Sequence, residues 1–372
     1  MKKLLLTIFI ACIFLGLGAT KIHAEGIHSK DFFSLEPQNW IFNSGMSKGR
    51  YHDRQDFGFI LSPNTVLKVR QVNPEFKSTI TVELVGDAAA IERSVTVGSE
   101  WTTISSTAAT VPLATTPYAM VNPKLEYEVE SSQPQKPLPI YNYGDSEKQF
   151  FSTWDKSDCE YGLVKGQDFQ ILVPRAGKEV ARHTTNFPNL DGVIDYYKKV
   201  FAHDNQLAGL DNSSPTNKQG KNRYFMKART DGNPGTAGTY GWNWTVHMSP
   251  TGSAWFGRNS WLALHEIAHG YQTGLDGKGM YTGEVFNNIF GATFQYKEMG
   301  KKEADRDGWL FDGNKAKIET NLYQKMVKNP GTYESVDTRE KLILQMVLLQ
   351  KAGTEAFTKM YQGYRLEANQ PG

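Results

Sequence analysis

One short motif in the chain has the residue types and the spacing of a metal centre, His265-Glu266-x-x-His269. On a helix, residues four apart lie on one face a turn apart, so both imidazoles can reach the same metal ion. Glu266 would then project beside a metal-bound water, whose pKa a zinc ion lowers to near neutrality. The motif therefore predicts hydrolysis with one catalytic Zn²⁺ as the cofactor and Glu266 as the general base.

A catalytic zinc ion needs a third protein ligand besides the two histidines. Glu284 is the predicted one, because it opens an amphipathic segment, residues 285–290, that is expected to form a second helix against the first. Glu298 and Glu303 are the alternatives, but the charged run around them is typical of a solvated face. Two His and one Glu form the ligand set of known zinc peptidases, although such a set also binds other divalent ions. The competing interpretation is a pair of structural histidines with a surface carboxylate.

Asparagines and tyrosines near the motif are candidates for supporting roles. Asn287 and Asn288 follow Glu284 closely, and we expect one of them either to orient a ligand or substrate or to serve in polar packing. For stabilising an oxyanion there are three candidates, and the sequence does not choose among them: Tyr240, Tyr271 and Tyr281.

Residues 240–248, just before the motif, alternate aromatic or apolar residues with polar ones, as a strand does. We predict an edge strand beside the cleft, which would pair with an extended substrate backbone by strand addition. Trp242 and Trp244 lie on its apolar side, where they could stack on sugar rings. A core strand with two buried tryptophans is an equally good interpretation.

The elements that must position these residues follow from periodicity along the chain. Between residues 57 and 130, apolar and polar residues alternate and turn signals divide the stretch into short strands, which predicts a β-sandwich-like domain at residues 25–130. A proline-rich junction at residues 131–145 is expected to run extended. The predicted fold class is α+β, with a catalytic domain at residues 146–372 that ends in a helical part.

Within the catalytic domain, the apolar residues 169–173 predict a short buried strand. A helix is expected from Leu190, since apolar residues recur after it at intervals of three and four. The polar and glycine-rich stretch at residues 204–240 is expected to form exposed loops, and helical stripes dominate after the motif.

The composition excludes several classes of protein. In a chain of 372 residues, 41 Lys+Arg against 39 Asp+Glu give no field for binding nucleic acid. The 45 aromatic residues (8 Trp, 17 Tyr and 20 Phe) are too many for a disordered chain, and two cysteines cannot make a disulfide framework. We expect a globular protein that acts as a monomer.

The first 24 residues resemble a secretory signal peptide, with Lys2 and Lys3 before an apolar run and Ala24 as a small residue for cleavage. A membrane anchor is disfavoured because about 15 apolar residues are fewer than the roughly 20 that a spanning helix needs. A lipid anchor at Cys12 is disfavoured because the apolar run continues beyond it. The mature chain would keep only Cys159, which suits a bacterial extracellular protein without a stable membrane anchor.

The string from His265 to Gln272, together with Glu284, Asn287 and Asn288, resembles the active site of the enhancin-like metallopeptidases, the family of viral enhancins and bacterial mucin-degrading relatives. The resemblance covers roughly residues 40–366 and includes the segments 56–60, 138–144, 169–174 and 222–225.

This resemblance implies a β-sandwich-like N-terminal part, a gluzincin-type catalytic part and a helical C-terminal part. It implies that His265, His269 and Glu284 bind zinc and that Glu266 is the catalytic base. The implied substrate is an extracellular mucin-type O-glycosylated protein. Many relatives continue into carbohydrate-binding or adhesion domains, whereas this sequence stops at Gly372. Glycan recognition is therefore expected in the catalytic domain and the N-terminal sandwich.

Three functional hypotheses follow. The first is a secreted zinc-dependent endopeptidase that cleaves mucin-type glycoproteins. The second is a glycan-binding or adhesion protein with little turnover, against which Glu266 argues, since a binding module needs no general base. The third is a zinc-dependent cell-wall amidase, which would use the same activation of water and which only substrate screening separates from the first.

Overall fold

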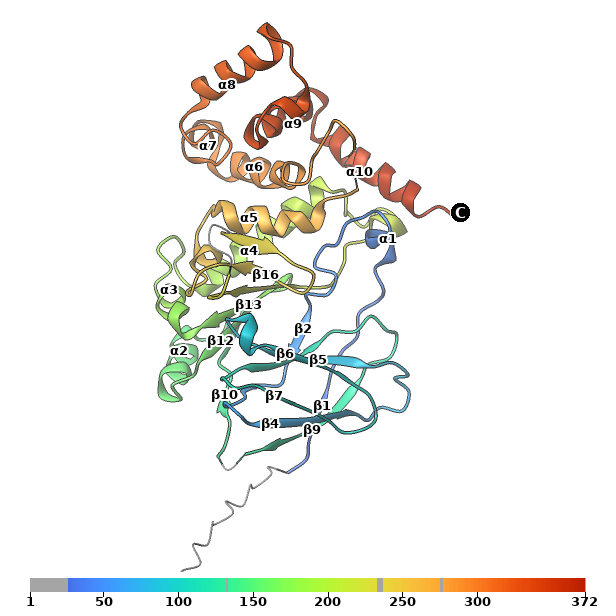
Figure 1. Ribbon diagram of the computed structural model, residues 1–372, viewed down its shortest axis with the longest axis vertical. Coiled ribbons are helices and arrows are strands. Elements are labelled where there is room, and N and C mark those ends of the chain that lie inside the picture. The colour runs from blue at the N-terminus through green and yellow to red at the C-terminus, as the bar shows by residue number, and fades with distance from the viewer. Residues whose placement is uncertain (1–25, 132, 233–236, 275–276, 372) are drawn as a thin grey trace, which may run out of the picture.

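Strands fill the N-terminal part of the protein and helices the C-terminal part (Figure 1), so the predicted α+β class is confirmed. The computed structural model describes residues 26–131, 133–232, 237–274 and 277–371. The expected signal peptide, residues 1–24, lies outside the described residues.

The N-terminal β region, residues 28–130, contains two antiparallel four-stranded sheets. The first has the order β1-β9-β4-β7, with the bounds His28–Asp31, Lys124–Glu130, Val66–Gln71 and Thr102–Ser105. The second has the order β2-β8-β5-β6, with the bounds Arg54–Asp56, Val111–Thr115, Ile80–Val85 and Arg93–Val97. Alternate residues of β4 are buried, Leu67 and Val69 among them, and they share a core with Val82 and Leu84 of β5. The apolar residues of this period-two pattern therefore face the core, as in a sheet with one buried face.

Residues 39–53 belong to the connection between β1 and β2 and lie against the helical part of the molecule. Helix α1 (Asn39–Phe42) touches the end of the chain, where the side-chain amide of Asn369 donates to the carbonyl oxygen of Trp40 at 3.0 Å. Further on, the main-chain N–H of Lys48 donates to the carbonyl oxygen of Gly270 at 2.7 Å. Figure 1 shows α1 close to α10 and far above the two sheets.

A six-stranded mixed sheet forms the centre of the remaining chain. Its order is β11-β12-β13-β14-β16-β15, with the bounds Ile140–Asn142, Tyr161–Lys165, Phe169–Pro174, Tyr224–Ala228, Thr245–His247 and Gly238–Tyr240. The predicted buried strand at residues 169–173 is β13, all of whose residues are buried.

Three expectations for this region need correction. The proline-rich junction is partly strand, because β10 (Lys136–Pro137) pairs with β3 (Phe59–Ile60) and β11 joins the sheet. The stretch expected to be exposed loops contains the buried strand β14. The single edge strand expected at residues 240–248 is a hairpin of two short strands, and only β15 lies at the edge of the sheet.

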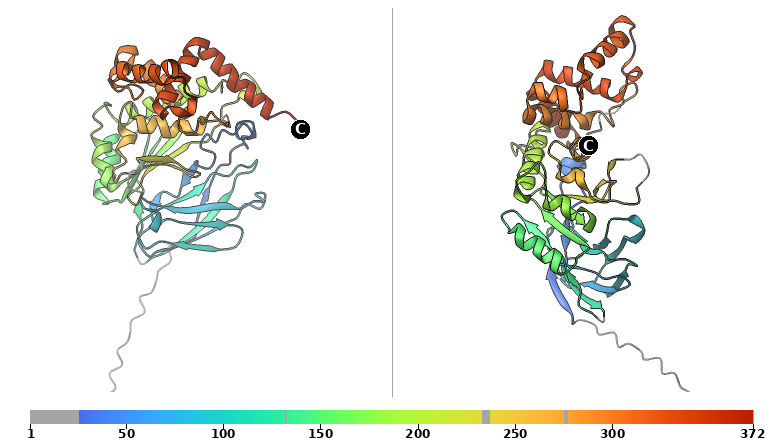
Figure 2. Two further views of the ribbon diagram at one scale, coloured as in Figure 1. Left: turned by 45° about the horizontal axis from the view of Figure 1, so that its top comes forward. Right: turned by 90° about the vertical axis from the view of Figure 1, so that its left-hand side faces the viewer.

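Helices cover the sheet and build the C-terminal part (Figure 2). Besides α1, the described helices are α2 (Glu147–Lys156), α3 (Lys178–Arg182), α4 (Leu190–Leu207), α5 (Trp261–Ala268), α6 (Phe286–Met299), α7 (Lys301–Asp307), α8 (Lys315–Tyr323), α9 (Thr338–Ala352) and α10 (Thr354–Ala368). Short 3-10 turns are η1 (Ala89–Ile91), η2 (Arg175–Gly177), η3 (Pro215–Asn217), η4 (Ser253–Phe256), η5 (His269–Tyr271) and η7 (Tyr333–Ser335), and η6 (Gln324–Lys328) is a π-helical turn. Helix α4 begins at the predicted Leu190 and buries its apolar stripe. Among the described helices, none has the length and apolar character that crossing a bilayer requires.

The largest apolar core runs through both parts of the molecule. It joins residues of the six-stranded sheet and of helices α4–α6, α9 and α10 with Ile41 and Met46 of the 39–53 segment and with Val85 and Val111 of the second N-terminal sheet. The N-terminal β region is therefore packed against the rest of the chain by buried apolar contacts as well as by polar ones.

Candidate active site

Helix α5 and the turn that follows it bring the two histidines of the motif to one face, as their spacing predicts. The helix is anchored by Ala263, Leu264 and Ile267, which are buried in the core. His265 lies in the helix and His269 directly after it, at the start of η5. The Nε2 atoms of the two imidazoles are 3.1 Å apart, and their rings are nearly perpendicular, at 88°.

Glu284 reaches the same point from the segment just before α6, which packs along α5. Its Oε2 atom lies 3.2 Å from Nε2 of His265 and 3.5 Å from Nε2 of His269. Ligands of a tetrahedral zinc ion with bonds of about 2.05 Å are about 3.3 Å from one another. The three side chains therefore fit a zinc ion, and hydrogen bonds from both imidazoles hold the pKa of Glu284 well below its usual value.

Neither alternative third ligand takes part in this arrangement. Glu298 lies towards the C-terminal end of α6 and pairs with Lys199 at 3.8 Å. Glu303 lies in the first turn of α7 and is exposed to solvent.

The outer nitrogens of both imidazoles are held by amide side chains. Nδ1 of His265 lies 2.6 Å from Oδ1 of Asn288, and Nδ1 of His269 lies 2.6 Å from Oε1 of Gln272. An acceptor at Nδ1 fixes the tautomer in which Nε2 is free to bind a metal. Nδ2 of Asn288 also donates to the carbonyl oxygen of Glu284 at 2.7 Å, so this one amide orients two of the three candidate ligands.

Gln272 ends the motif string that begins at His265, but its role in orienting a ligand was not predicted. Its only signal in the sequence is its position three residues after His269, which places it within reach of that imidazole. Asn287, the other asparagine considered, is fully buried, and its Nδ2 donates to the main-chain oxygen of His265 at 3.3 Å. The same Nδ2 atom lies 3.1 Å from Nδ1 of His265 and 3.2 Å from Nε2 of His269, so Asn287 contacts both imidazoles as well as the backbone of α5.

Glu266 faces a cavity of about 520 Å³ and is 4% exposed. Burial raises the pKa of its carboxyl group, against the opposing effects of His265 and His269 and of a main-chain hydrogen bond from Tyr240. The edge strand β15 runs directly beside it: a Cβ atom on Gly238 would lie 3.0 Å from Oε1 of Glu266 and 2.8 Å from the carbonyl oxygen of Val246. Glycine at this position allows the edge strand to approach the carboxylate.

The cavity is bounded by residues from four segments of the chain. They are Gly45, Ser47, Gly238, Thr239, Tyr240, His265, Glu266, His269, Gln272, Thr273, Gly274 and Glu284. The contribution of Gly45 and Ser47 was not predicted, because they lie within the range assigned to the N-terminal sandwich and carry no motif.

The three tyrosine candidates occupy different environments. Tyr240 lines the cavity, where its hydroxyl accepts the N–H of Gly49 at 2.7 Å and lies 2.8 Å from Oγ of Ser47. Burial raises the pKa of Tyr240 to about 12, so the hydroxyl keeps its proton. Tyr271 is fully buried and donates to Oδ1 of Asn205, away from the cavity lining, and so is not placed to contact a substrate. Tyr281 is 52% exposed and is not part of the lining.

The two tryptophans also differ. Trp242 lies in the turn between β15 and β16, is 66% exposed and packs on Tyr51 with ring centroids 4.8 Å apart. Trp244 packs against the core, with Nζ of Lys227 4.4 Å from its ring centroid. Trp242 is therefore available to a ligand, whereas Trp244 serves in packing.

Comparison with known proteins agrees with this geometry. The family model of peptidase M60, enhancin and enhancin-like, matches residues 135–372, and no curated protein gives a significant match. A functionally unknown conserved protein from Bacillus anthracis has a TM-score of 0.70 at 14% identity, covering 92% of this chain and 68% of that one. The ZmpB metallopeptidase of Clostridium perfringens has a TM-score of 0.69 at 16% identity, covering 93% and 72%. The M60 catalytic domain of Clostridium perfringens ZmpC, in complex with the sialyl T antigen, has a TM-score of 0.66 at 14% identity, covering 92% and 71%.

The structural matches show that the fold is shared along nearly the whole described chain, N-terminal β region included. The family model covers well over half of the sequence, including the motif and Glu284. The chain belongs to the peptidase M60 family of enhancin and enhancin-like metallopeptidases.

Proposed function

We propose that this protein is a secreted zinc-dependent endopeptidase that hydrolyses peptide bonds in mucin-type O-glycosylated proteins. The observation that carries the proposal is the convergence of His265, His269 and Glu284 at mutual distances of 3.1–3.5 Å beside the buried carboxylate of Glu266. An adhesion protein has no use for a general base in that position.

In this proposal His265, His269 and Glu284 hold one zinc ion. When bound there, zinc supplies a Lewis acid and a more acidic water. Glu266 accepts a proton from the attacking water and passes it to the leaving amine. The Tyr240 hydroxyl, which accepts the N–H of Gly49, keeps its own proton to donate to the oxyanion.

The substrate backbone would lie along β15, which is at one edge of the six-stranded sheet and forms a wall of the cavity. An extended peptide can add there as a further strand. The exposed ring of Trp242, next to Tyr51, offers an apolar face on which a sugar can stack. Support for a glycosylated substrate comes from the related ZmpC domain, whose structure holds the sialyl T antigen.

Secretion is proposed from the signal-peptide pattern of residues 1–24. An extracellular enzyme would meet mucin-type glycoproteins without needing a nucleic-acid partner or a membrane anchor. We propose that it acts as a monomer, since the described residues form both the cavity wall and the candidate ligand set within one chain.

The proposal is tested by incubating the mature chain, residues 25–372, with an O-glycosylated mucin and following the peptide products by mass spectrometry. Glu266→Gln and a chelator-treated sample should lose cleavage, and Glu298→Gln, the same change near the C-terminal end of α6, should retain it. Mucin binding without cleavage by folded, zinc-loaded protein would favour the adhesion hypothesis. Release of cell-wall peptides or amides instead of mucin peptides would favour the amidase.

A further inference from the structure

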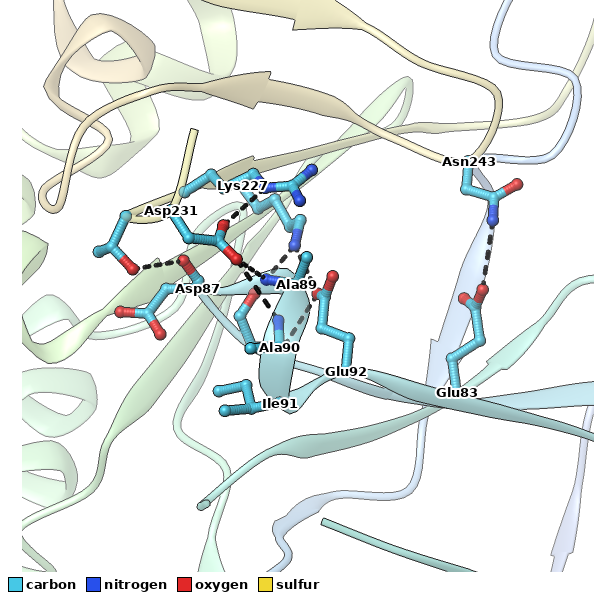
Figure 3. Close-up of polar contacts among 12 residues, drawn as sticks. Glu83, Asp87, Ala89, Ala90, Ile91, Glu92, Lys227, Asp231 and Asn243 are labelled. Atoms are coloured by element: carbon cyan, nitrogen blue, oxygen red, sulfur yellow. Dashed lines mark hydrogen bonds and ion pairs between the residues drawn. The ribbon is translucent and has the colours of Figure 1, made fainter. Parts of the chain in front are cut away.

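The N-terminal β region holds the chain on the N-terminal side of the edge strand. The turn between β5 and β6 lies against the end of β14 and the residues that follow it (Figure 3). The N–H of Thr230 donates to the carbonyl oxygen of Asp87 at 2.7 Å, and the N–H of Ala89 donates to Oδ2 of Asp231 at 2.6 Å. Asp231 thus accepts a hydrogen bond from the start of η1, a turn that belongs to the other part of the molecule.

A buried lysine strengthens the same contact. Lys227 at the end of β14 is 1% exposed, and its ammonium group donates to the carbonyl oxygen of Gly86 at 3.0 Å and pairs with Glu92. The same ammonium lies over the ring of Trp244, the residue just before β16. A buried charge of this kind is costly unless it is fully paired. Because moving the β5–β6 turn away from β14 would leave this charge unpaired, the two segments are held in one relative position.

Arg54 of β2 holds the chain on the C-terminal side of the edge strand. Its side chain is fully buried, and Nε donates to Oε2 of Glu83 in β5 at 2.7 Å. Its Nη1 group donates to the carbonyl oxygens of His52, at 2.7 Å, and of Asn243, in the turn after β15. Glu83 also lies 3.5 Å from Nδ2 of Asn243 (Figure 3), so the Arg54–Glu83 pair fastens this turn to the N-terminal sheet at two points.

These contacts bracket β15 on both sides. Residues 227–231 precede the strand and residues 241–244 follow it, and the turn is held further by His52, whose Nε2 lies 3.0 Å from the carbonyl oxygen of Gly241. Between the two anchors, β15 is packed so closely that a Cβ atom on Gly238 would lie 2.8 Å from the carbonyl oxygen of Val246 and 3.0 Å from Oε1 of Glu266. A small displacement of either anchor would move the strand relative to the carboxylate.

We propose that the N-terminal β region is the support that sets the distance of the edge strand β15 from Glu266, with Arg54 as the central positioning residue. In this role the region acts in catalysis through β15, and a separate glycan-binding function for it is unnecessary. The part of the inference that concerns substrate rests on the proposed function, whereas the positioning of β15 can be measured without any substrate.

The test compares Arg54→Lys with Arg70→Lys in the whole mature chain by amide hydrogen exchange. Lysine can still pair with Glu83, but its single ammonium cannot also reproduce the planar fork that reaches Asn243. Arg70 makes the same type of pair at 2.9 Å, with Glu126 in the first N-terminal sheet. Loss of one charge-assisted hydrogen bond should speed exchange at residues 238–247 about tenfold in Arg54→Lys, with residues 261–268 unchanged. Arg70→Lys should leave both segments unchanged.

If a cleavable mucin peptide has been identified, Arg54→Lys should also raise its KM and leave zinc content unaltered, because the ligands lie on other elements. Equal amide exchange at residues 238–247 in Arg54→Lys and Arg70→Lys would overturn the proposal. An increase in exchange of the same size at residues 238–247 and 261–268 in Arg54→Lys would also overturn it. Should Arg54→Lys not fold, Asp231→Asn replaces it, with the exposed Asp31→Asn as its control. The same local increase in exchange is then expected around β15, and its absence overturns the proposal.

Discussion

Oε1 of Gln272 lies 2.6 Å from Nδ1 of His269, and the Nε2 group of the same amide donates to the main-chain oxygen of Gly283. One side chain thus links the imidazole at the end of α5 to the residue before Glu284. Asn288 makes the mirrored connection from His265 to the main chain of Glu284. The two segments that carry the candidate ligands are therefore tied together by a pair of amides.

Removing the Gln272 amide should weaken metal binding without removing a ligand. We expect Gln272→Leu to lower zinc affinity about 10–100-fold, because the imidazole of His269 loses the acceptor that fixes its orientation. Competition with a chromogenic chelator measures this affinity. Gln324→Leu, on an exposed turn, is the matched control and should bind zinc as the unaltered protein does. Equal affinities for the two variants would contradict the orienting role.

The choice of Glu284 over the other glutamates as third ligand can be tested directly. Glu284→Gln should lower the zinc content of the purified protein and reduce the rise in Tm that added zinc produces, since a ligand bound only by the folded state stabilises it. Glu303→Gln, an exposed position on α7, should change neither quantity. Unchanged zinc content in Glu284→Gln would reopen the question of the third ligand.

Tyr240 is expected to act in the chemical step. Tyr240→Phe should reduce kcat about 10²-fold, the usual cost of removing one oxyanion donor, with little change in KM. Tyr281→Phe is the control, because that tyrosine is exposed outside the cavity lining. Steady-state kinetics on a mucin glycopeptide distinguishes them, and a larger loss in Tyr281→Phe would transfer the role to that residue.

Trp242 is expected to bind the glycan part of the substrate. Replacing it by Ala should raise KM for an O-glycosylated peptide about tenfold, the cost of losing one aromatic stacking contact, and should affect the unglycosylated peptide far less. Trp101→Ala provides the comparison, because Trp101 is a partly exposed tryptophan of the N-terminal β region that packs on Arg70. An equal rise in KM for both peptides would show that Trp242 does not bind the sugar.

The buried His203 should make the protein sensitive to acid. Its Nε2 lies 2.9 Å from Oγ1 of Thr293, and burial, aided by Lys297, lowers its pKa to about 4. An unfolded histidine has a pKa of about 6.5, so the unfolded state binds more protons between these values and stability falls as pH drops through that window. Between pH 7 and pH 4.5 the loss from this residue should be about 2 kcal/mol.

Urea unfolding at the two pH values tests this expectation. His203→Gln should lose less stability on acidification than the unaltered protein, whereas His183→Gln, at an exposed site, should lose as much. Some acid sensitivity should remain, because burial also lowers the pKa of His52, to about 3. A pH dependence unchanged by His203→Gln would contradict the prediction.

The sequence by itself determined what depends on local periodicity. A spacing of four on a helix brings His265 and His269 to one face whatever surrounds them, and the amphipathic segment after Glu284 became α6 as its apolar residues require. Alternation with period two likewise predicted strands in the N-terminal β region, and β4 buries one face as such a pattern requires, whereas β5 is buried on both faces.

Only the tertiary structure decided which side chains share the cavity. Tyr240 is separated from Ser47 by 193 residues, yet their hydroxyls lie 2.8 Å apart, and the anchoring of β15 by Arg54 spans 189 residues. Periodicity states which face of an element is apolar, but it carries no information about which distant element covers that face. Tyr271 was therefore indistinguishable from Tyr240 in the sequence, and packing alone buried one hydroxyl against Asn205 and placed the other beside Ser47 and Gly49.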